Sequence, residues 1–221
     1  MTSVPDYDGL RFPRGLYGIT PDTDDTAGLL AAIAAAARGG LRSLQWRRKQ
    51  SASPEALLAQ GQAIARQCRE LGLVFIVNDD WRMAQDLDAD GVHLGRDDGD
   101  LQAARAALGQ GRIIGVSCYA DLARARALLA QGADYIAFGA VYPSPTKPQA
   151  ARAPLELLMQ ARKLLDELPA PRPAMVAIGG IHAANAAPVV QAGADALAII
   201  QGIFQADDIE AAASACAQAF A

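Results

Sequence analysis

The chain has 221 residues, of which 52% are hydrophobic and 5% aromatic, and its formal net charge is −4 at pH 7. This length suffices for a substantial buried core and falls within the range of a single α/β barrel domain. General nucleic-acid binding requires a basic surface, so this charge predicts no nucleic-acid partner. The apolar run "LLAAIAAAA" is far shorter than a membrane span, so we also expect no membrane partner.

Eight short apolar runs recur along the chain, and several are apolar on both faces, as the strands of a covered parallel sheet are. They are "LYGIT" (16–20), "SLQWR" (43–47), "VFIVN" (74–78), "GVHLG" (91–95), "IIGVS" (113–117), "YIAFGAV" (135–141), "MVAIGG" (175–180) and "ALAII" (197–201). Segments rich in good helix formers separate these runs. The clearest are 26–38, 55–71, 100–108, 121–131, 154–167 and 207–219.

This alternation predicts a single-domain (β/α)8 TIM barrel. The alternative, a doubly wound sheet, would usually show a glycine-rich loop after its first strand, and "LYGITPDTDD" is no such loop. We interpret residues 1–14 as an N-terminal tail and 15–221 as the barrel domain. A related phrase, "DADGVHLG", "GADYIAFG" and "GADALAII", precedes three of the strands and indicates a repeating unit.

Residues at helix ends agree with this alternation. Ser53, which precedes a proline, is a candidate N-cap. Glycines follow four of the helical segments, where a C-terminal glycine is common. They are Gly39, Gly72, Gly132 and Gly193.

Three scattered cysteines, Cys68, Cys118 and Cys216, fit neither a disulfide framework nor a zinc-ligand spacing. A reducing, cytoplasmic location is the simplest interpretation. The opening residues "MTSVPDYDGLRFPRG" lack the apolar region of a signal peptide, which favours the same location. The oligomeric state is left open, and a homo-oligomer is compatible with the sequence.

The active site of a TIM barrel lies at the carboxyl ends of its strands, so the residues that close each run are the candidates. In "SLQWRRKQ" the side chains alternate across the strand. Gln45, Arg47 and Lys49 therefore face the barrel mouth, where the two cations are candidate anion ligands. Arg48 has the opposite parity, and we expect it to be a solvated surface charge.

Acidic residues close the next two runs. Asn78, Asp79 and Asp80 end one strand, and Asp97 and Asp98 follow the next. Mg²⁺ usually takes one or two carboxylates together with substrate phosphate oxygens, which predicts a magnesium site beside Arg47 and Lys49. For any single aspartate, capping of a following helix is an equally good explanation.

The next mouth residues give no indication of a protein nucleophile. Ser117 closes the fifth run, and Cys118 after it has no histidine nearby in the sequence. The two histidines, His93 within a strand and His182 at a helix start, make a Ser-His-Asp or Cys-His mechanism improbable. We expect His93 to be a hydrogen-bonded structural residue and His182 to lie at the surface.

The seventh run ends in Gly179-Gly180 and the eighth in Gln201-Gly202. The loops after these two strands form the usual phosphate site of such barrels. Gly180, Gln201 and Gly202 are the candidates there. The proline-rich loop "VYPSPTKPQ" follows the sixth run, and its Lys147 is expected beside the magnesium carboxylates. Two anion sub-sites at one mouth indicate two phosphorylated substrates, one of which carries a pyrophosphate leaving group.

The chain resembles the thiamine phosphate synthase family from about "LYGITPD" to "GIFQADD". The matching stretches are "QWRRK", "VNDD", "ADGVHLGRDD", "GVSC", "GADYIAFGAVYPSPTK" and "AIGGI". The resemblance implies a transferase that joins a hydroxymethylpyrimidine pyrophosphate to a thiazole phosphate by a magnesium-assisted dissociative displacement. The products are thiamine phosphate and pyrophosphate.

The resemblance also implies a role for each matching residue. Gln45 would meet the pyrimidine, and Asp79 and Asp98 would bind Mg²⁺. Two further sets would hold the phosphates. Arg47, Lys49, Asn78, Ser117 and Lys147 would hold the pyrophosphate, whereas Ser144, Thr146, Gly180 and the backbone near Gln201 and Gly202 would take the thiazole phosphate.

Two positions depart from the family pattern: Arg96 stands where the family usually has glutamine, and Gln201 where serine is common at the end of the eighth strand. Two alternatives remain. A thiazole tautomerase of the same superfamily typically lacks the paired carboxylates and carries a histidine shortly after the fifth strand. A non-catalytic regulator that binds thiamine precursors is the second alternative, and the Gln201 departure keeps it open.

Overall fold

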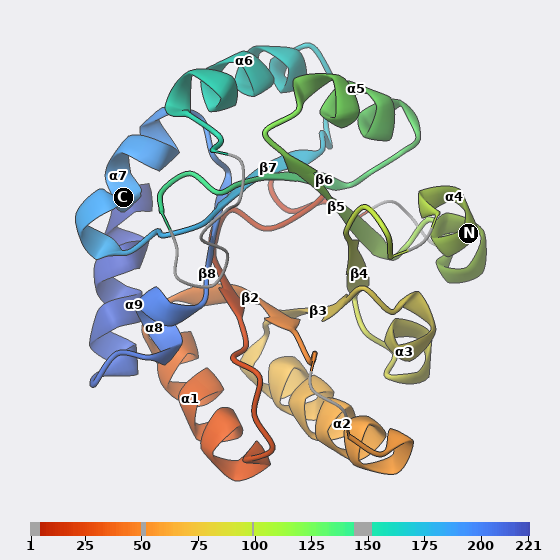
Figure 1. Ribbon diagram of the computed structural model, residues 1–221, viewed down its shortest axis with the longest axis vertical. Coiled ribbons are helices and arrows are strands. Elements are labelled where there is room, and N and C mark those ends of the chain that lie inside the picture. The colour runs from red at the N-terminus through yellow and green to blue at the C-terminus, as the bar shows by residue number, and fades with distance from the viewer. Residues whose placement is uncertain (1–4, 50–51, 99, 144–151) are drawn as a thin grey trace.

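The computed structural model describes residues 5–49, 52–98, 100–143 and 152–221. Eight parallel strands close into a barrel in which each strand pairs with the next one in the chain and β8 pairs with β1. The helices form a ring around the barrel (Figure 1). The predicted (β/α)8 TIM barrel is therefore confirmed.

The strands begin and end within a few residues of the predicted apolar runs. The strands are β1 (Gly15–Ile19), β2 (Leu41–Trp46), β3 (Val74–Asn78), β4 (Gly91–Leu94), β5 (Ile113–Tyr119), β6 (Tyr135–Phe138), β7 (Ala174–Ile178) and β8 (Ala196–Ile199). The helices are α1 (Thr26–Arg38), α2 (Pro54–Leu71), α3 (Trp81–Asp86), α4 (Leu101–Leu108), α5 (Leu122–Ala130), α6 (Leu155–Asp166), α7 (Ala183–Gln191), α8 (Gln201–Phe204) and α9 (Ile209–Ala217), followed by the 3₁₀ turn η1 (Gln218–Phe220). Composition specifies no helix at α3 or α8, which are short. At α7, which contains Pro188, the sequence indicated only the two ends, through His182 and Gly193.

Alternation along each strand divides the buried residues into two cores. Leu44 and Trp46 pack in the outer core between barrel and helices, as predicted for β2. Tyr17, Ile76 and Tyr135 belong to a smaller core that fills the barrel interior. The inner core fills the centre of the barrel, and the space for a ligand in the described part of the barrel lies at its mouth.

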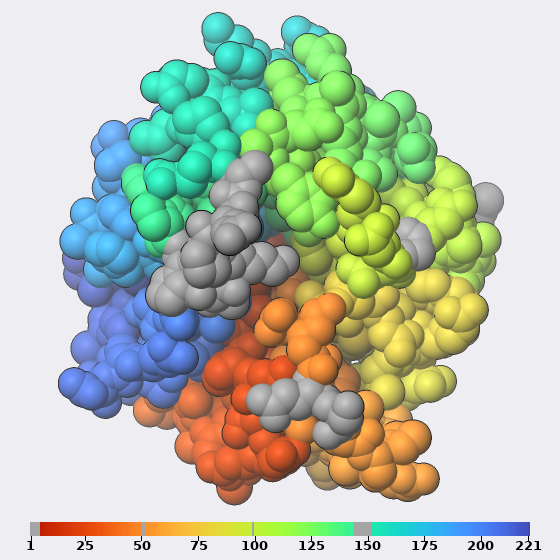
Figure 2. Space-filling view, in the orientation of Figure 1, coloured from red at the N-terminus to blue at the C-terminus, as the bar shows by residue number. Residues whose placement is uncertain are grey.

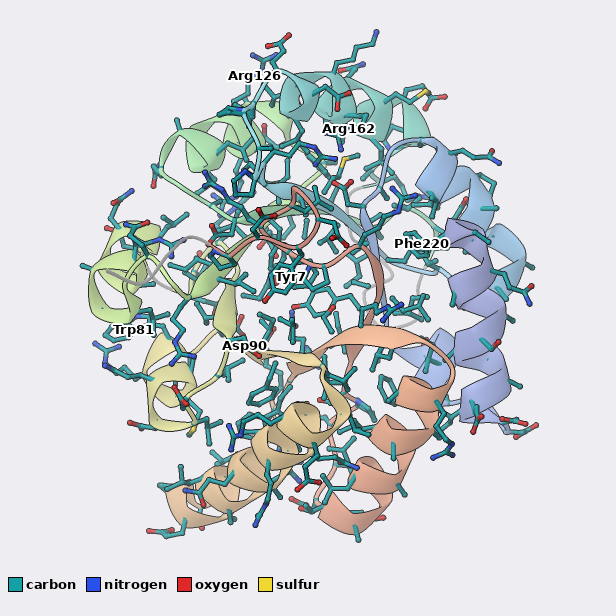
Figure 3. The ribbon with its side chains drawn as sticks, turned by 180° about the vertical axis from the view of Figure 1, so that it is seen from behind. Tyr7, Trp81, Asp90, Arg126, Arg162 and Phe220 are labelled. Atoms are coloured by element: carbon teal, nitrogen blue, oxygen red, sulfur yellow. The ribbon has the colours of Figure 1, made fainter. Side chains whose placement is uncertain are left out.

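The N-terminal segment packs against the base of the barrel. Phe12 is 0% exposed, and its ring centroid lies 4.9 Å from that of Tyr17 and 4.5 Å from that of Tyr135. Tyr7 packs against the same inner core, and it lies over the centre of the barrel when the molecule is seen from behind (Figure 3). Residues 5–14 thus precede the first strand but form the floor of the barrel instead of a free tail.

The repeated phrase before three strands has a structural role at this base. Its aspartates are Asp90, Asp134 and Asp195, and each carboxylate accepts a hydrogen bond from the backbone of the strand before it. The donors are the N–H groups of Phe75 (2.7 Å), Ile114 (2.8 Å) and Met175 (2.8 Å), respectively. Each donor is the second residue of its strand, so the repeat ties β4, β6 and β8 to β3, β5 and β7.

We expect Asp195→Ala to lower the free energy of unfolding by about 3 kcal/mol, because it leaves buried groups without their acceptor. Asp195 is buried and also binds Arg172, with Nη2 2.9 Å from Oδ1, and Arg162. Urea denaturation measures the loss. Asp207→Ala, at an exposed position, is the control and should change little; equal stability of the two variants would contradict this role.

The predicted residues at helix ends are mostly confirmed. The Ser53 hydroxyl accepts from the Ala56 N–H at 3.2 Å, and Gly72 ends α2 in the left-handed region at φ 67°. At the end of α1 the prediction was one residue early. Gly39 has φ −75°, and Gly40 adopts the positive φ of 99° instead.

All three cysteines are free and buried, in agreement with the absence of a predicted disulfide framework. Burial raises the pKa of the Cys68 and Cys118 thiols to about 12, which keeps both protonated and unreactive at neutral pH. Within the ranges given above, no helix combines the length and apolar character needed to cross a bilayer.

Candidate active site

A cavity of about 750 Å³ opens at the carboxyl ends of the strands. In the space-filling view of this face, the segments after β1, β2 and β4 gather around the centre (Figure 2). Ten of the residues selected from sequence line it: Gln45, Arg47, Lys49, Asn78, Asp79, Asp98, Ser117, Gly180, Gln201 and Gly202. The other three, Ser144, Thr146 and Lys147, lie outside the described residues.

The end of β2 supplies the neutral and cationic groups. Gln45 is 3% exposed, and its Nε2 donates to the Tyr17 hydroxyl at 2.7 Å. The backbone N–H of Arg47 donates to Thr20 Oγ1 at 2.9 Å, which ties the end of β2 to that of β1. Arg47 and Lys49 line the cavity, as the alternation of side chains along β2 predicts, and this hydrogen bond fixes the backbone from which they project.

Arg48 corrects the sequence interpretation. Its side chain is only 6% exposed and forms ion pairs with Asp22 and Asp24, so it is not a solvated charge. Asp22 also accepts from the backbone N–H of Lys49 at 2.8 Å. Arg48 thus holds the loop after β1 against the end of β2. Its side chain points away from the side that Arg47 and Lys49 face, and there it meets the two aspartates.

Asp79 and Asp98 meet across the ends of β3 and β4. Burial, and then hydrogen bonding and repulsion from the adjacent Asp79 carboxylate, raise the pKa of Asp98. Gly95 N–H donates to Asp98 Oδ2 at 3.0 Å, and Asn78 Nδ2 donates to Asp79 Oδ2 at 2.6 Å. The Lys49 ammonium forms an ion pair with Asp79. Two facing carboxylates of this kind favour a shared proton or a shared cation.

The other two aspartates of these clusters play no part in the cavity. Asp80 caps α3, accepting from the N–H groups of Arg82 and Met83 at 2.9 and 3.0 Å, which is the helix-capping explanation. Asp97 is exposed. In the part of the chain that the structure describes, no cluster of three or more His, Cys, Asp or Glu residues could hold a metal.

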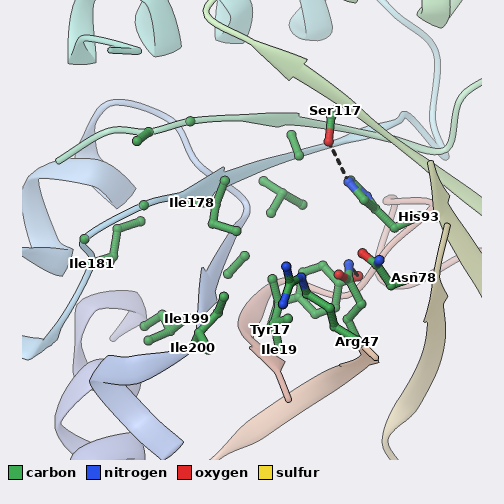
Figure 4. A pocket seen from close by; sticks show the side chains of 18 of the residues that line it. Tyr17, Ile19, Arg47, Asn78, His93, Ser117, Ile178, Ile181, Ile199 and Ile200 are labelled. Carbon is green, nitrogen blue, oxygen red and sulfur yellow. Dashed lines mark hydrogen bonds between the residues drawn. The ribbon is translucent and has the colours of Figure 1, made fainter. Parts of the chain in front are cut away.

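The opposite wall of the cavity is apolar and glycine-rich. Ile178, Ile181, Ile199 and Ile200 line it across from Arg47 and Asn78 (Figure 4). The glycine that follows β7 there, Gly180, has a φ of 63°, and a Cβ on it would lie 2.4 Å from the Pro143 carbonyl oxygen. A side chain at this turn would therefore clash with the backbone that follows β6, so glycine allows the two segments to pack closely.

Sequence reasoning missed several residues of the wall. Tyr17, Ile19, His93 and Tyr119 also line the cavity. Strand parity in "LYGIT" could have placed Tyr17 and Ile19 inside the barrel. His93 has the hydrogen-bonded role expected of it, with Nε2 2.9 Å from Ser117 Oγ (Figure 4). His182 is exposed, as expected, and lies at the rim of the same cavity.

A TIM barrel with paired carboxylates, two cations and a glycine turn at its mouth has the features of a barrel enzyme that acts on small molecules. Comparisons with known proteins agree with this class. The family model described as thiamine monophosphate synthase matches residues 16–203. The chain is 61% identical over 211 residues to a thiamine-phosphate synthase of Bordetella bronchiseptica, covering 96% of this chain and 97% of that protein.

More distant relatives extend the same result. A thiamine-phosphate synthase of Aromatoleum aromaticum is 55% identical, with 91% of this chain and 94% of that protein covered. The solved structure of a thiamine phosphate pyrophosphorylase from Pyrococcus furiosus superimposes with a TM-score of 0.79 at 30% identity, covering 93% and 94% of the two chains. The chain belongs to the thiamine monophosphate synthase family, whose synthase activity is that of a transferase.

Proposed function

We propose that this transferase condenses 4-amino-2-methyl-5-hydroxymethylpyrimidine pyrophosphate with 4-methyl-5-(2-phosphoethyl)thiazole, or its carboxylated form. The products are thiamine phosphate and pyrophosphate. Besides family membership, one observation supports this reaction most strongly: Asp79, Asp98, Arg47 and Lys49 line the cavity after β2, β3 and β4, and the glycine turn at Gly180 lines it after β7. Two phosphorylated substrates can therefore bind with their anions apart and their reacting rings between them.

Asp79 and Asp98 would hold Mg²⁺. The fit rests on the donor set. Two adjacent carboxylates, with no third acidic, histidine or cysteine ligand in a cluster with them among the described residues, match the few protein ligands that Mg²⁺ takes beside phosphate oxygens. When bound, the ion would neutralise charge on the pyrophosphate. Lys49 now forms an ion pair with Asp79, so its ammonium is already beside the place where the pyrophosphate would lie.

The residues of the chain would stabilise the leaving group and position the rings. The Arg47 guanidinium, the Lys49 ammonium, the Asn78 amide and the Ser117 hydroxyl all face the cavity and would bind the departing pyrophosphate. Lys147 is assigned to the same anion. Bond breaking would run ahead of attack by the thiazole nitrogen on the pyrimidine-methyl cation, so no protein nucleophile is needed.

Residues at the pyrimidine end and at the thiazole phosphate end of the cavity would orient the two substrates. Gln45 would meet the pyrimidine ring, and the isoleucine wall would exclude water from the cation. The thiazole phosphate would lie on the backbone of the β7 and β8 turns, with the hydroxyl pair of the proline-rich loop completing the site. These residues are Gly180, Gln201, Gly202, Ser144 and Thr146.

The direct test is to supply both precursors with MgCl₂ and to measure thiamine phosphate and pyrophosphate by chromatography. We expect the two products in equal amounts. Isomerisation of a thiazole precursor without coupling would favour the tautomerase. Folded protein that binds the precursors without forming product would favour the non-catalytic regulator.

A further inference from the structure

We propose that Tyr17, Tyr135 and His93 form a directed hydrogen-bond relay that orients Gln45 at one end and Ser117 at the other. The three are positioning residues, because they act on the substrate through these two ends. The relay itself is a property of the free protein. Its effect on the pyrimidine substrate rests on the proposed function.

The relay crosses the barrel interior through four contacts. Gln45 Nε2 lies 2.7 Å from the Tyr17 hydroxyl, which lies 2.8 Å from the Tyr135 hydroxyl. The Tyr135 hydroxyl lies 2.9 Å from His93 Nδ1, and His93 Nε2 lies 2.9 Å from Ser117 Oγ. His93 also stacks on Tyr135, with ring centroids 5.5 Å apart and an interplanar angle of 18°. Residues from β1, β2, β4, β5 and β6 thus share one chain of contacts.

Counting protons gives this chain a direction. With Nε2 of the Gln45 amide toward Tyr17, the Tyr17 oxygen accepts, and Gln45 also hydrogen bonds to the Tyr135 hydroxyl. Tyr17 is 1% exposed, and among the described residues the Tyr135 hydroxyl is the one acceptor left for its proton. Tyr135 is 0% exposed and must then donate to His93 Nδ1. A buried hydroxyl proton without an acceptor would cost about 1–3 kcal/mol, which disfavours the other orders.

The direction determines what each end presents to the cavity. With Nδ1 as acceptor, His93 is the neutral Nε2–H tautomer and donates to Ser117 Oγ. The Ser117 proton is then available to an anion in the cavity. At the other end, Gln45 uses its NH₂ group inside the barrel and presents Oε1, an acceptor, which suits an amino group on the pyrimidine.

Both tyrosines are suited to carry protons in this order. Burial is the main cause that raises the pKa of Tyr17 and of Tyr135, so both hydroxyls remain protonated throughout the physiological range. Phe12 packs on both rings from the base of the barrel and holds them in place. The relay is therefore built into the inner core and does not depend on a flexible side chain.

The first test reads the tautomer of His93 by ¹⁵N NMR in the free protein at pH 8. The chain has two histidines, so His182→Asn assigns the signals. We expect the Nε2–H tautomer, and we expect Tyr135→Phe to abolish that preference. An Nδ1–H tautomer, an imidazolium, or an unchanged spectrum in Tyr135→Phe would overturn the relay. This result is independent of whether thiamine phosphate is formed.

The second test is a kinetic double-mutant cycle between Tyr135→Phe and Ser117→Ala. We expect Tyr135→Phe to lower kcat/KM for the pyrimidine pyrophosphate about tenfold, with KM for the thiazole phosphate unchanged. Because the effect passes through Ser117, it should shrink severalfold in the Ser117→Ala background. Tyr7→Phe, at the barrel base, is the matched control. An undiminished effect in that background, or an equal effect of Tyr7→Phe, would reduce Tyr135 to a packing residue.

Discussion

Asp79→Ala is expected to lower kcat about 10³-fold with Mg²⁺ present, because a bound metal contributes several kcal/mol to charge stabilisation in the transition state. The variant leaves Asp98 alone to hold the ion and frees Lys49 from its ion pair. Steady-state assays across a range of MgCl₂ concentrations measure the effect, and circular dichroism checks the fold. Asp97→Ala, at the exposed neighbouring position, should retain activity.

The same site predicts a pH dependence. The folded state raises the pKa of Asp98 through burial and the nearby Asp79 carboxylate, so a proton competes with Mg²⁺ as the pH falls. The MgCl₂ concentration for half-maximal activity should therefore increase towards acidic pH. Product formation that is insensitive to a chelator and to Asp79→Ala would refute the metal assignment and leave the synthase reaction standing.

Lys49→Met should reduce kcat about 10²-fold, since it removes a cation from the leaving group while keeping the length of the side chain. Lys49 is half-exposed at the mouth, and its ammonium already forms an ion pair with Asp79. Stopped assays with saturating precursors separate kcat from KM. Lys163→Met, an exposed lysine on α6, is the control.

The distribution of the loss between kcat and KM decides the role of Lys49. A lower kcat at unchanged KM indicates that the ammonium acts on the departing pyrophosphate. A higher KM alone would show that it only binds the ground state. No change in either constant would contradict the assignment of Lys49 and leave Arg47 as the principal cation of the end of β2.

Much of the candidate site was predictable, because in a barrel the alternation of side chains along a strand decides which of them face the interior and the mouth. Gln45, Arg47 and Lys49 follow an alternating strand, so their direction could be deduced without knowing any contact. Asp79 and Asp98 could be located because adjacent parallel strands end at the same edge. The resemblance of several ordered motifs then suggested the family, and the comparisons confirm it.

Other features depended on contacts between residues distant in the sequence. Arg48 has the parity of a surface charge, yet Asp22 and Asp24 from another loop remove it from solvent. Asp79 and Asp80 both follow β3, but they have different roles. Asp80 caps α3, whereas Asp79 lines the cavity. Phe12 lies in a segment that the sequence predicts to be a tail. Its complete burial follows from its packing on Tyr17 and Tyr135 at the base of the barrel.

The sequence by itself determined the barrel, the edge that carries the site and the charged residues gathered there, because these follow from local periodicity and from the order of strands. Only the tertiary structure decided how those residues are paired. The relay from Gln45 to Ser117 joins five strands through Tyr17, Tyr135 and His93. No local pattern encodes such a path, since each hydrogen bond depends on the distance and burial of groups that meet only when the barrel closes.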